Sequence, residues 1–136
     1  MIGVLIVTHG AVGEQMLATA SQILGAAPAR ALSIGVGPDE DPEAVLACAR
    51  ALVAQIDDGS GVLVLTDMFG ATPGNIAARL LADGRIEGVT GLSLPMLVRA
   101  LSGREGTLDA AVQRALSGGA QGVLHMNRDG CRNAQR

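Results

Sequence analysis

Two short apolar runs in this chain end abruptly in polar residues. The run Val4 to Val7 leads directly into Thr8-His9-Gly10, and the run Gly61 to Thr66 leads into Asp67. Consecutive apolar residues rich in β-branched side chains are typical of strands buried on both faces, as in a parallel sheet. In open α/β sheets, ligands bind outside the carboxyl ends of such strands. The sequence therefore predicts a parallel sheet with polar, chemically useful groups along one edge.

Segments with helical spacing of apolar residues alternate with the apolar runs. The pattern predicts helices at about 12–24, 42–56, 73–81, 95–102 and 108–116, and strands at about 4–7, 31–36, 61–66 and 86–92. Strict alternation of strand and helix is typical of parallel sheets with right-handed crossovers. We therefore predict a doubly wound α/β fold with a mainly parallel central sheet, strand order 2-1-3-4, and helices on both faces.

A chain of 136 residues has the length of one domain. We expect this domain to span residues 1–126. Residues 127–136 are polar without periodicity and are expected to form a disordered tail. Gly122 to Met126 could form a last short strand.

Composition excludes several classes of function. The formal net charge is -3, the cations include no lysine, and Phe69 is the only aromatic residue. Such a chain lacks the basic surface and the stacking platforms of nucleic-acid-binding proteins. Cys48 and Cys131 are too few to indicate a disulfide framework or a zinc site. No apolar run reaches the length of a membrane span, and we expect a cytoplasmic protein. The residues present call for no metal or other cofactor.

His9 and Asp67 follow the first and third predicted strands. If these strands are neighbours, both side chains lie at the topological switch point of the sheet. A neutral imidazole is a competent nucleophile once its tautomer is fixed, and a carboxylate that accepts one ring N–H fixes it. The pair therefore predicts a nucleophilic His9 that is oriented by Asp67.

The loop after Asp67 leads into a predicted helix, with Thr72 as its N-cap and Pro73 as its first residue. Main-chain amides and the positive end of the helix dipole make such a helix start an anion site. Gly70, Ala71 and Thr72 are the predicted phosphate-binding residues. Together with His9 and Asp67 they predict phosphoryl transfer to and from a histidine, a reaction that depends on positioning and charge stabilisation.

Each of these features also has a plainer interpretation. A histidine that ends a strand can be purely structural, and an aspartate after a buried strand commonly caps a turn. A cap hydrogen bond would compete for the Thr72 hydroxyl. His125 is expected to be a surface or interface residue, and the acidic run Asp39 to Asp41 with Glu43 is typical of a solvated helix start.

Taken together, the two polar stretches resemble the enzyme IIA domain of the mannose family of the bacterial sugar phosphotransferase system. The resemblance extends over about residues 1–126 and depends on Thr8-His9-Gly10 and on Asp67 to Asn75, which reads Asp-Met-Phe-Gly-Ala-Thr-Pro-Gly-Asn. It implies that His9 accepts a phosphoryl group from the phosphocarrier HPr and passes it to a IIB partner. It also implies that Asp67 orients the imidazole and that Thr72 helps to hold the phosphate.

The resemblance further implies an assembly. Related proteins are homodimers in which the last strand adds to the partner's sheet, antiparallel to the other strands. Gly122 to Met126 is the segment expected to do so. The chain is expected to be a stand-alone IIA that serves sugar uptake or a regulatory phosphorelay and reaches the membrane only through a IIC/IID complex. Ala71 stands where a second glycine is more usual in the family, and its methyl is expected to restrict the phosphate loop.

Three alternatives remain at this stage. The phosphotransferase subunit of dihydroxyacetone kinase also resembles this chain and has a histidine after its first strand. A histidine phosphatase or a chelatase-like enzyme can also place His-Gly after its first strand. A histidine phosphatase would have an arginine directly before the histidine, where this chain has Thr8. A chelatase would need a second metal-ligand histidine, and His125 lies at the wrong end of the chain for that role. The last alternative is a non-catalytic binding module in which His9 is structural.

Overall fold

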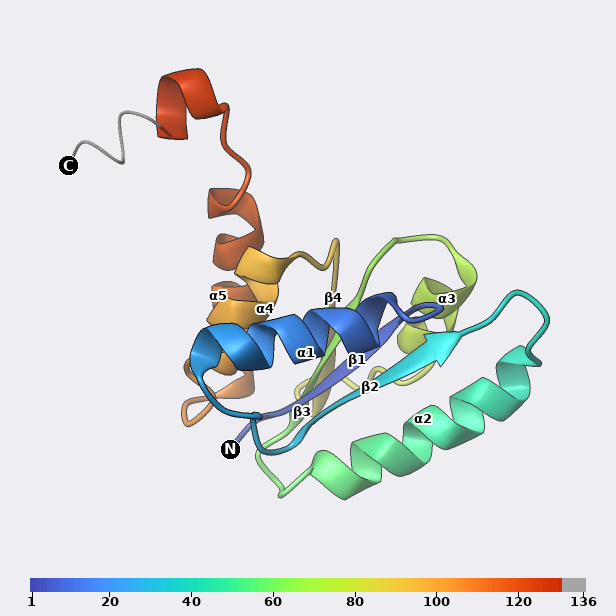
Figure 1. The fold of residues 1–136 in the computed structure, drawn as a ribbon. Coiled ribbons are helices and arrows are strands. Elements are labelled where there is room, and N and C mark those ends of the chain that lie inside the picture. Colours follow the sequence, from blue (N-terminus) through green and yellow to red (C-terminus); the bar gives the residue numbers. More distant parts are fainter. Residues whose placement is uncertain (131–136) are drawn as a thin grey trace.

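The computed structural model describes residues 1–130 as a layer of strands between two layers of helices (Figure 1). The strands are β1 (Gly3–His9), β2 (Ala31–Val36), β3 (Val62–Thr66) and β4 (Ile86–Thr90). The helices are α1 (Val12–Leu24), α2 (Pro42–Ile56), α3 (Thr72–Ala78), α4 (Leu94–Leu101) and α5 (Leu108–Gln121), and a π-helical turn, η1 (Met126–Gly130), follows them.

The four strands form one parallel sheet in the order β2-β1-β3-β4, which confirms the predicted order. β1 lies in the interior of the sheet, and its pairing with β3 places Val7 opposite Thr66. Asp67 follows Thr66 and therefore lies beside the end of β1. β2 and β4 are the two edge strands.

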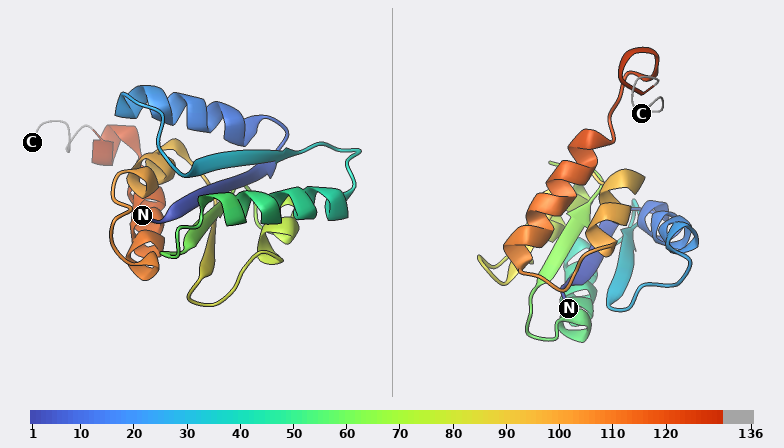
Figure 2. Two further views of the ribbon diagram at one scale, coloured as in Figure 1. Left: turned by 90° about the horizontal axis from the view of Figure 1, so that it is seen from below. Right: turned by 90° about the vertical axis from the view of Figure 1, so that its left-hand side faces the viewer.

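Both faces of the sheet are covered, because the side chains of β1 alternate between two cores. Val4 and Ile6 pack in the core under α1, α4 and α5, whereas Leu5 and Val7 pack in the core under α2 and α3. All four side chains are fully buried. Figure 2 shows α1 and α2 on opposite sides of the sheet, as a doubly wound fold requires.

The helix ends follow the sequence signals unevenly. α2 begins as predicted, since the Asp41 side chain caps it by accepting a hydrogen bond from the Glu43 amide at 3.1 Å, and Pro42 is the first helical residue. α5 continues to Gln121, beyond the end predicted at about Leu116. Its last turns pack closely on α4, which stabilises them despite their glycines. Gly118 permits this close packing, since a Cβ there would lie 2.8 Å from the Cβ of Arg99.

The predicted antiparallel last strand is absent from the described chain. Gly122 ends α5, and residues 123–125 form no strand before η1 begins at Met126. This segment projects from the body of the molecule (Figure 1), where no strand of the same sheet borders it. A strand needs a paired neighbour, so the single chain gives this segment no reason to extend. Of the predicted tail, residues 127–130 lie in η1 and 131–136 lie outside the described residues.

Candidate functional site

The ends of β1 and β3 bring His9 and Asp67 into direct contact. Asp67 Oδ2 lies 2.9 Å from Nδ1 of His9 and also accepts the main-chain N–H of His9 at 3.1 Å. One carboxylate oxygen therefore holds both the backbone and the ring of the histidine. The contact predicted from the two strand ends is present in the structure.

The surroundings of the pair favour an ionised Asp67 and one tautomer of the neutral His9 ring. Burial alone would raise the pKa of Asp67, but the hydrogen bonds and charge of His9 outweigh it and hold that pKa below its ordinary value. An ionised Asp67 can only accept at Nδ1, so the proton of a neutral His9 belongs on Nδ1. The side chain of His9 is 49% exposed, and Nε2 makes no hydrogen bond among residues 1–130. The geometry thus leaves the lone pair of Nε2 available at the surface.

Thr8 holds the turn that carries the histidine, a role that the sequence analysis missed. Its hydroxyl accepts the Gly13 amide at 2.7 Å and donates to the His9 carbonyl at 3.2 Å, with the residue fully buried. Thr8 therefore ties the end of β1 to the first turn of α1. A buried hydroxyl at the last position of an apolar strand was the available signal, because such a group needs a partner.

A second constraint on the same turn comes from β2. Gly10 adopts φ 45°, a conformation that favours glycine, and its amide donates to the Val36 carbonyl at 3.0 Å. The turn passes so close to β2 that a Cβ on Gly35 would lie 1.9 Å from the Gly10 carbonyl oxygen. The backbone around His9 is therefore fixed from both neighbouring strands.

His9 and Thr72 face the same cavity, which has a volume of about 440 Å³. It lies between the end of β1, the loop from β2 to α2 and the start of α3. Its lining consists of His9, Gly10, Val36, Gly37, Pro38, Glu40, Pro42, Thr72 and Pro73. Gly70 and Ala71, the other predicted phosphate-binding residues, are not part of this lining.

The start of α3 differs from the prediction in one detail. Ala71 is the N-cap and Thr72 the first helical residue, and no side chain caps the helix. The prediction that Thr72 is the N-cap was wrong, because the chain is still extended at Ala71 and already helical at Thr72. The Thr72 hydroxyl is therefore not engaged in a cap, and the residue is exposed at the cavity.

The loop before α3 has different requirements at its two predicted positions. Gly70 has φ 82°, where a side chain would be strained. Ala71 has φ -96° and ψ 172°, a region open to any residue. The Ala71 methyl therefore imposes no backbone strain in this conformation.

Glu40 is the second residue of this cavity that the sequence analysis missed. Its acidic neighbours made it look like part of a solvated helix start, but Glu40 lines the cavity together with His9. Its Oε1 accepts the Gly37 amide at 2.8 Å. The signal was weak, because a carboxylate three residues after a glycine is common in loops that have no site.

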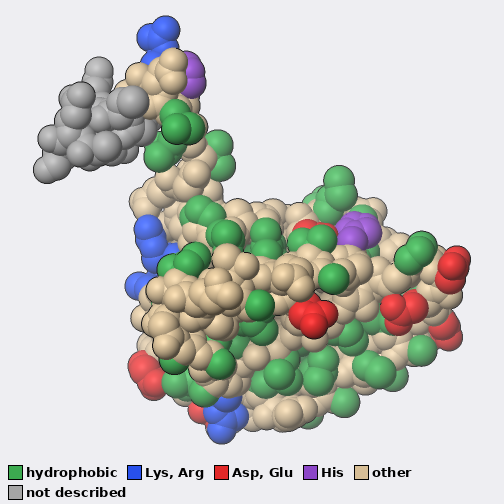
Figure 3. All heavy atoms as spheres, viewed as in Figure 1, with side chains coloured by type: hydrophobic (Ala, Val, Ile, Leu, Met, Phe, Trp, Pro, Cys, Tyr) green, Lys and Arg blue, Asp and Glu red, His purple; other side chains and the backbone are tan. Residues whose placement is uncertain are grey.

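The remaining candidates lie elsewhere. Figure 3 shows the two histidines of the chain far apart, with acidic side chains gathered near one of them. His125 is exposed in the segment after α5, in agreement with a surface position. Cys48 is a free thiol exposed on α2. Within residues 1–130, no three His, Cys, Asp or Glu side chains are grouped as metal ligands would be.

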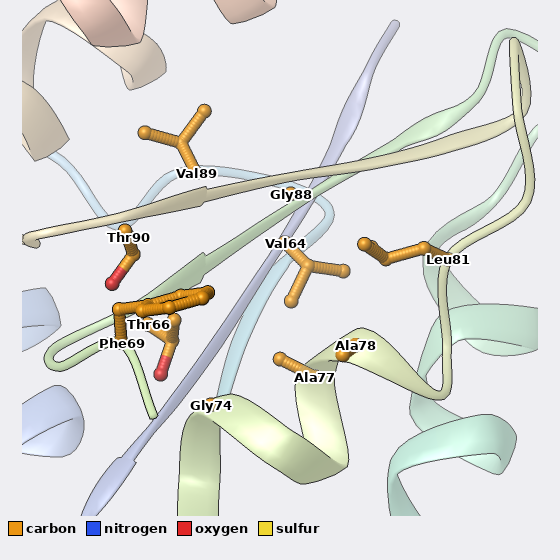
Figure 4. Close-up of a pocket in the computed structure, with 10 residues that line it drawn as sticks. All are labelled: Val64, Thr66, Phe69, Gly74, Ala77, Ala78, Leu81, Gly88, Val89 and Thr90. Atoms are coloured by element: carbon orange, nitrogen blue, oxygen red, sulfur yellow. The ribbon is translucent and has the colours of Figure 1, made fainter. Parts of the chain in front are cut away.

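A separate apolar pocket of about 220 Å³ lies between β3, β4 and α3. Figure 4 shows the Phe69 ring lying across Thr66 and Thr90, at the ends of the two strands. The Thr66 hydroxyl is buried there, with no hydrogen-bond partner in the described part of the chain. His9 does not line this pocket, so the pocket is separate from the histidine site.

Comparisons with known proteins agree with the fold and with the family that the stretches around His9 and Asp67 resemble. A family model described as the PTS system fructose IIA component (EIIA-man) matches residues 3–116. The PTS system mannose-specific EIIAB component of Escherichia coli K12 is 35% identical over 125 residues, which are 90% of this chain and 38% of that protein. The chain thus spans about two fifths of the length of this relative.

Solved structures give the same result. The phosphotransferase system component EIIA from Streptococcus agalactiae superposes with a TM-score of 0.83 at 26% identity, covering 93% of this chain and 98% of that one. The PTS IIA protein associated with the fucose utilization operon from Streptococcus pneumoniae gives a TM-score of 0.81 at 25% identity, covering 93% of each chain. None of these matches favours a dihydroxyacetone kinase subunit, a phosphatase, a chelatase or a non-catalytic module. No helix in the described part of the chain is long and apolar enough to cross a membrane.

Proposed function

The chain belongs to the mannose-type IIA components of the sugar phosphotransferase system, and from this premise we propose that it carries a phosphoryl group on Nε2 of His9. The contact between Nδ1 and Asp67 Oδ2 at 2.9 Å is the observation that carries the proposal. It fixes the tautomer that leaves Nε2 nucleophilic, and the half-exposed ring makes that nitrogen accessible to another protein.

The transfer is a displacement at phosphorus. The Nε2 lone pair attacks the phosphorus of the phosphohistidine on HPr, the P–N bond of the donor breaks, and its electron pair stays on the donor nitrogen. His9 keeps the proton on Nδ1, so its phosphorylated ring becomes cationic. Asp67 balances that charge across the existing hydrogen bond. The same steps in reverse pass the group to a IIB partner.

The phosphoryl group is held by the start of α3. Thr72 supports this role because its hydroxyl is free of a cap and the residue lines the cavity beside His9. Gly70 and Ala71 precede it in the same loop and contribute main-chain amides. No metal ion is needed, because the transferred charge is met by amides, by the hydroxyl and by the partner.

With HPr as phosphoryl donor and a IIB component as acceptor, the protein can have one of two physiological roles. The protein serves sugar uptake, acting in the cytoplasm and reaching the membrane through a IIC/IID complex, or it serves a regulatory phosphorelay. The 35% identity to a mannose-specific EIIAB component supports the first role.

Phosphorylation with phosphoenolpyruvate, enzyme I and HPr tests the site, with the second histidine as a matched control. We expect wild type and His125→Ala to acquire one phosphate that is labile in acid and stable in base. His9→Ala should acquire none. Labelling of His9→Ala to the level of wild type would show that the nucleophile lies elsewhere.

We also propose that the chain forms a homodimer through the segment Gly122 to Met126. Val123 and Met126 support this, since they expose 82% and 75% of their surface, and β4 offers an open sheet edge. Light scattering at micromolar concentration should give the mass of a dimer for the full chain and of a monomer for a chain that ends at Gln121. A full-length monomer would disprove the exchange.

A further inference from the structure

The cavity beside His9 contains a carboxylate that the transfer mechanism does not use. Glu40 lines it from the loop between β2 and α2, and Thr72 lines it from the start of α3. Its Oε1 is held by the Gly37 amide at 2.8 Å, and Gly37 lines the same cavity. The carboxylate is therefore fixed at the cavity by the loop that carries it.

The other charges around the cavity make this position unusual for a phosphate site. None of the lining residues is a lysine or an arginine, and the chain has no lysine. Asp67, directly behind His9, is a second carboxylate with its pKa held low. Of the neighbouring acids, Glu43 is paired with Arg79 and Asp41 caps α2, whereas Glu40 has no cationic partner among residues 1–130.

A fixed negative charge acts differently on the two states of His9. The nucleophilic form of His9, with a proton on Nδ1 and a lone pair on Nε2, carries no net charge, so Glu40 has little effect on it. The phosphoryl group brings up to two negative charges into the same cavity as the Glu40 carboxylate. Both sites are open to solvent, which weakens the repulsion between these charges without abolishing it. The charge therefore raises the free energy of the phosphorylated protein relative to the free one.

From this arrangement, and resting on the proposed function of His9, we propose that Glu40 sets the phosphoryl-transfer equilibrium of the site by electrostatic repulsion. It lowers the fraction of phosphate retained on His9 and so favours onward transfer to the acceptor. Asp67 and Glu40 then have opposite effects: Asp67 balances the cationic ring, and Glu40 opposes the anionic group that the ring carries.

The test separates the charge of Glu40 from its structural contact. Glu40→Gln keeps an Oε1 acceptor for the Gly37 amide and removes the charge. Glu105→Gln makes the same chemical change at an exposed residue outside the cavity and serves as the matched control. The equilibrium constant for phosphoryl exchange between phospho-HPr and His9 is measured for each protein at low salt and at about 1 M salt, where the Debye length falls to about 3 Å.

At low salt, we expect Glu40→Gln to raise the equilibrium constant toward phosphorylated His9 by about 3- to 10-fold, the range of a single charge acting across a partly solvated cavity. Glu105→Gln should leave it unchanged. At high salt the Glu40→Gln effect should shrink toward 1. Phosphorylation by phosphoramidate, a small donor without a docking surface, should be faster in Glu40→Gln, again at low salt only.

Several outcomes would overturn the proposal. An unchanged equilibrium constant would show that the charge is not felt at His9. An effect that persists at high salt would show that Glu40 acts through the shape of the loop. A change in the rate of the HPr reaction at an unchanged equilibrium constant, with phosphoramidate unaffected, would make Glu40 a docking residue. Absence of label on His9 in the wild-type protein would instead refute the proposed function, and this inference with it.

Discussion

Each end of β1 has a polar, nitrogen-bearing side chain beside it, and the two are used in opposite ways. At the carboxyl end, His9 is 49% exposed and meets Asp67. At the amino end, Arg104 is 6% exposed, and its Nη1 lies 3.4 Å from the Ile2 carbonyl and 3.3 Å from the Arg30 carbonyl. The carboxyl end of the strand exposes its imidazole, and the amino end buries its guanidinium.

The difference lies in what the hydrogen-bonding capacity is used for. Arg104 uses it on main-chain carbonyls, and its own carbonyl accepts the Ile2 amide at 2.8 Å, so it joins three segments of the chain. Burial lowers the pKa of Arg104, but an arginine remains charged. At the other end, Asp67 Oδ1 is buried without a partner in the described chain. A charge that is fully engaged with the backbone stabilises the fold, whereas one with unused capacity is available for chemistry.

The largest expected effect breaks the carboxyl end of this comparison. Asp67→Asn should slow phosphorylation of His9 by about 10²- to 10⁴-fold, because an amide neither fixes the Nδ1–H tautomer nor balances the cationic ring. Rapid-quench transfer from phospho-HPr measures the rate, and thermal unfolding should show a folded variant. A rate within a factor of two of wild type would remove Asp67 from the mechanism.

Removal of Arg104 tests the amino end. Arg104→Met keeps the apolar stem but leaves two carbonyls without their partner, so we expect a loss of about 1–3 kcal/mol in the free energy of unfolding. The transfer rate should not change. Urea denaturation compares it with Arg85→Met, an exposed arginine without a side-chain hydrogen bond in the described chain, which should stay within about 0.5 kcal/mol of wild type. Slowed transfer at full stability would contradict the assignment of Arg104 to the fold.

Thr8 is the residue where the two roles overlap. Thr8→Val deprives the Gly13 amide of its buried acceptor and frees the His9 carbonyl. We expect a loss of about 1–2 kcal/mol in unfolding free energy together with slower phosphorylation. Thr8→Ser, which keeps the hydroxyl, should restore most of both. If Thr8→Val loses stability without any loss of rate, the turn does not position the histidine.

The smallest effect is the response to acid. Because the pKa of Asp67 is lower in the folded than in the unfolded protein, its contribution to stability is complete above the ordinary carboxyl pKa of about 3.9 and is lost as the pH falls through the folded value. The difference in unfolding free energy between wild type and Asp67→Asn should therefore shrink below about pH 4. The difference for Arg104→Met should stay constant over the same range, since arginine does not titrate there. A wild-type to Asp67→Asn difference that is independent of pH would refute the cause assigned to the shift.

Much of this site was predictable because it depends on the ends of strands. Val4 to Val7 had to be buried on both faces, and alternating strands and helices favour a parallel sheet. Once the first and third strands are neighbours, His9 and Asp67 meet at the same edge. Local signals also located the start of α2, where Asp41 and Pro42 act within one turn of the chain.

Predictions that depended on contacts between distant segments were less complete. Thr72 has the sequence of an N-cap, yet the helix starts one residue earlier, and α5 passes through Gly118 because it packs closely on α4. Glu40 is exposed, as the solvated acidic run predicts, but only the structure shows that it also lines the cavity, because the loop between β2 and α2 meets the start of α3 there.

The sequence by itself determined the parallel sheet, since burial and strand alternation act over a few residues. The strand order and the meeting of His9 with Asp67 were predictions that required the first and third strands to be neighbours, and the pairing of β1 with β3 confirms both. Only the tertiary structure decided which ring nitrogen faces Asp67, that Thr8 anchors the histidine turn, and that Glu40 joins the cavity. The contact between the ring and Asp67 depends on the register of β1 with β3, which brings residues 58 positions apart within hydrogen-bond distance. The hydrogen bonds of Thr8 and Glu40 join near neighbours in the chain, and the bends of the chain that allow them are visible only in the structure.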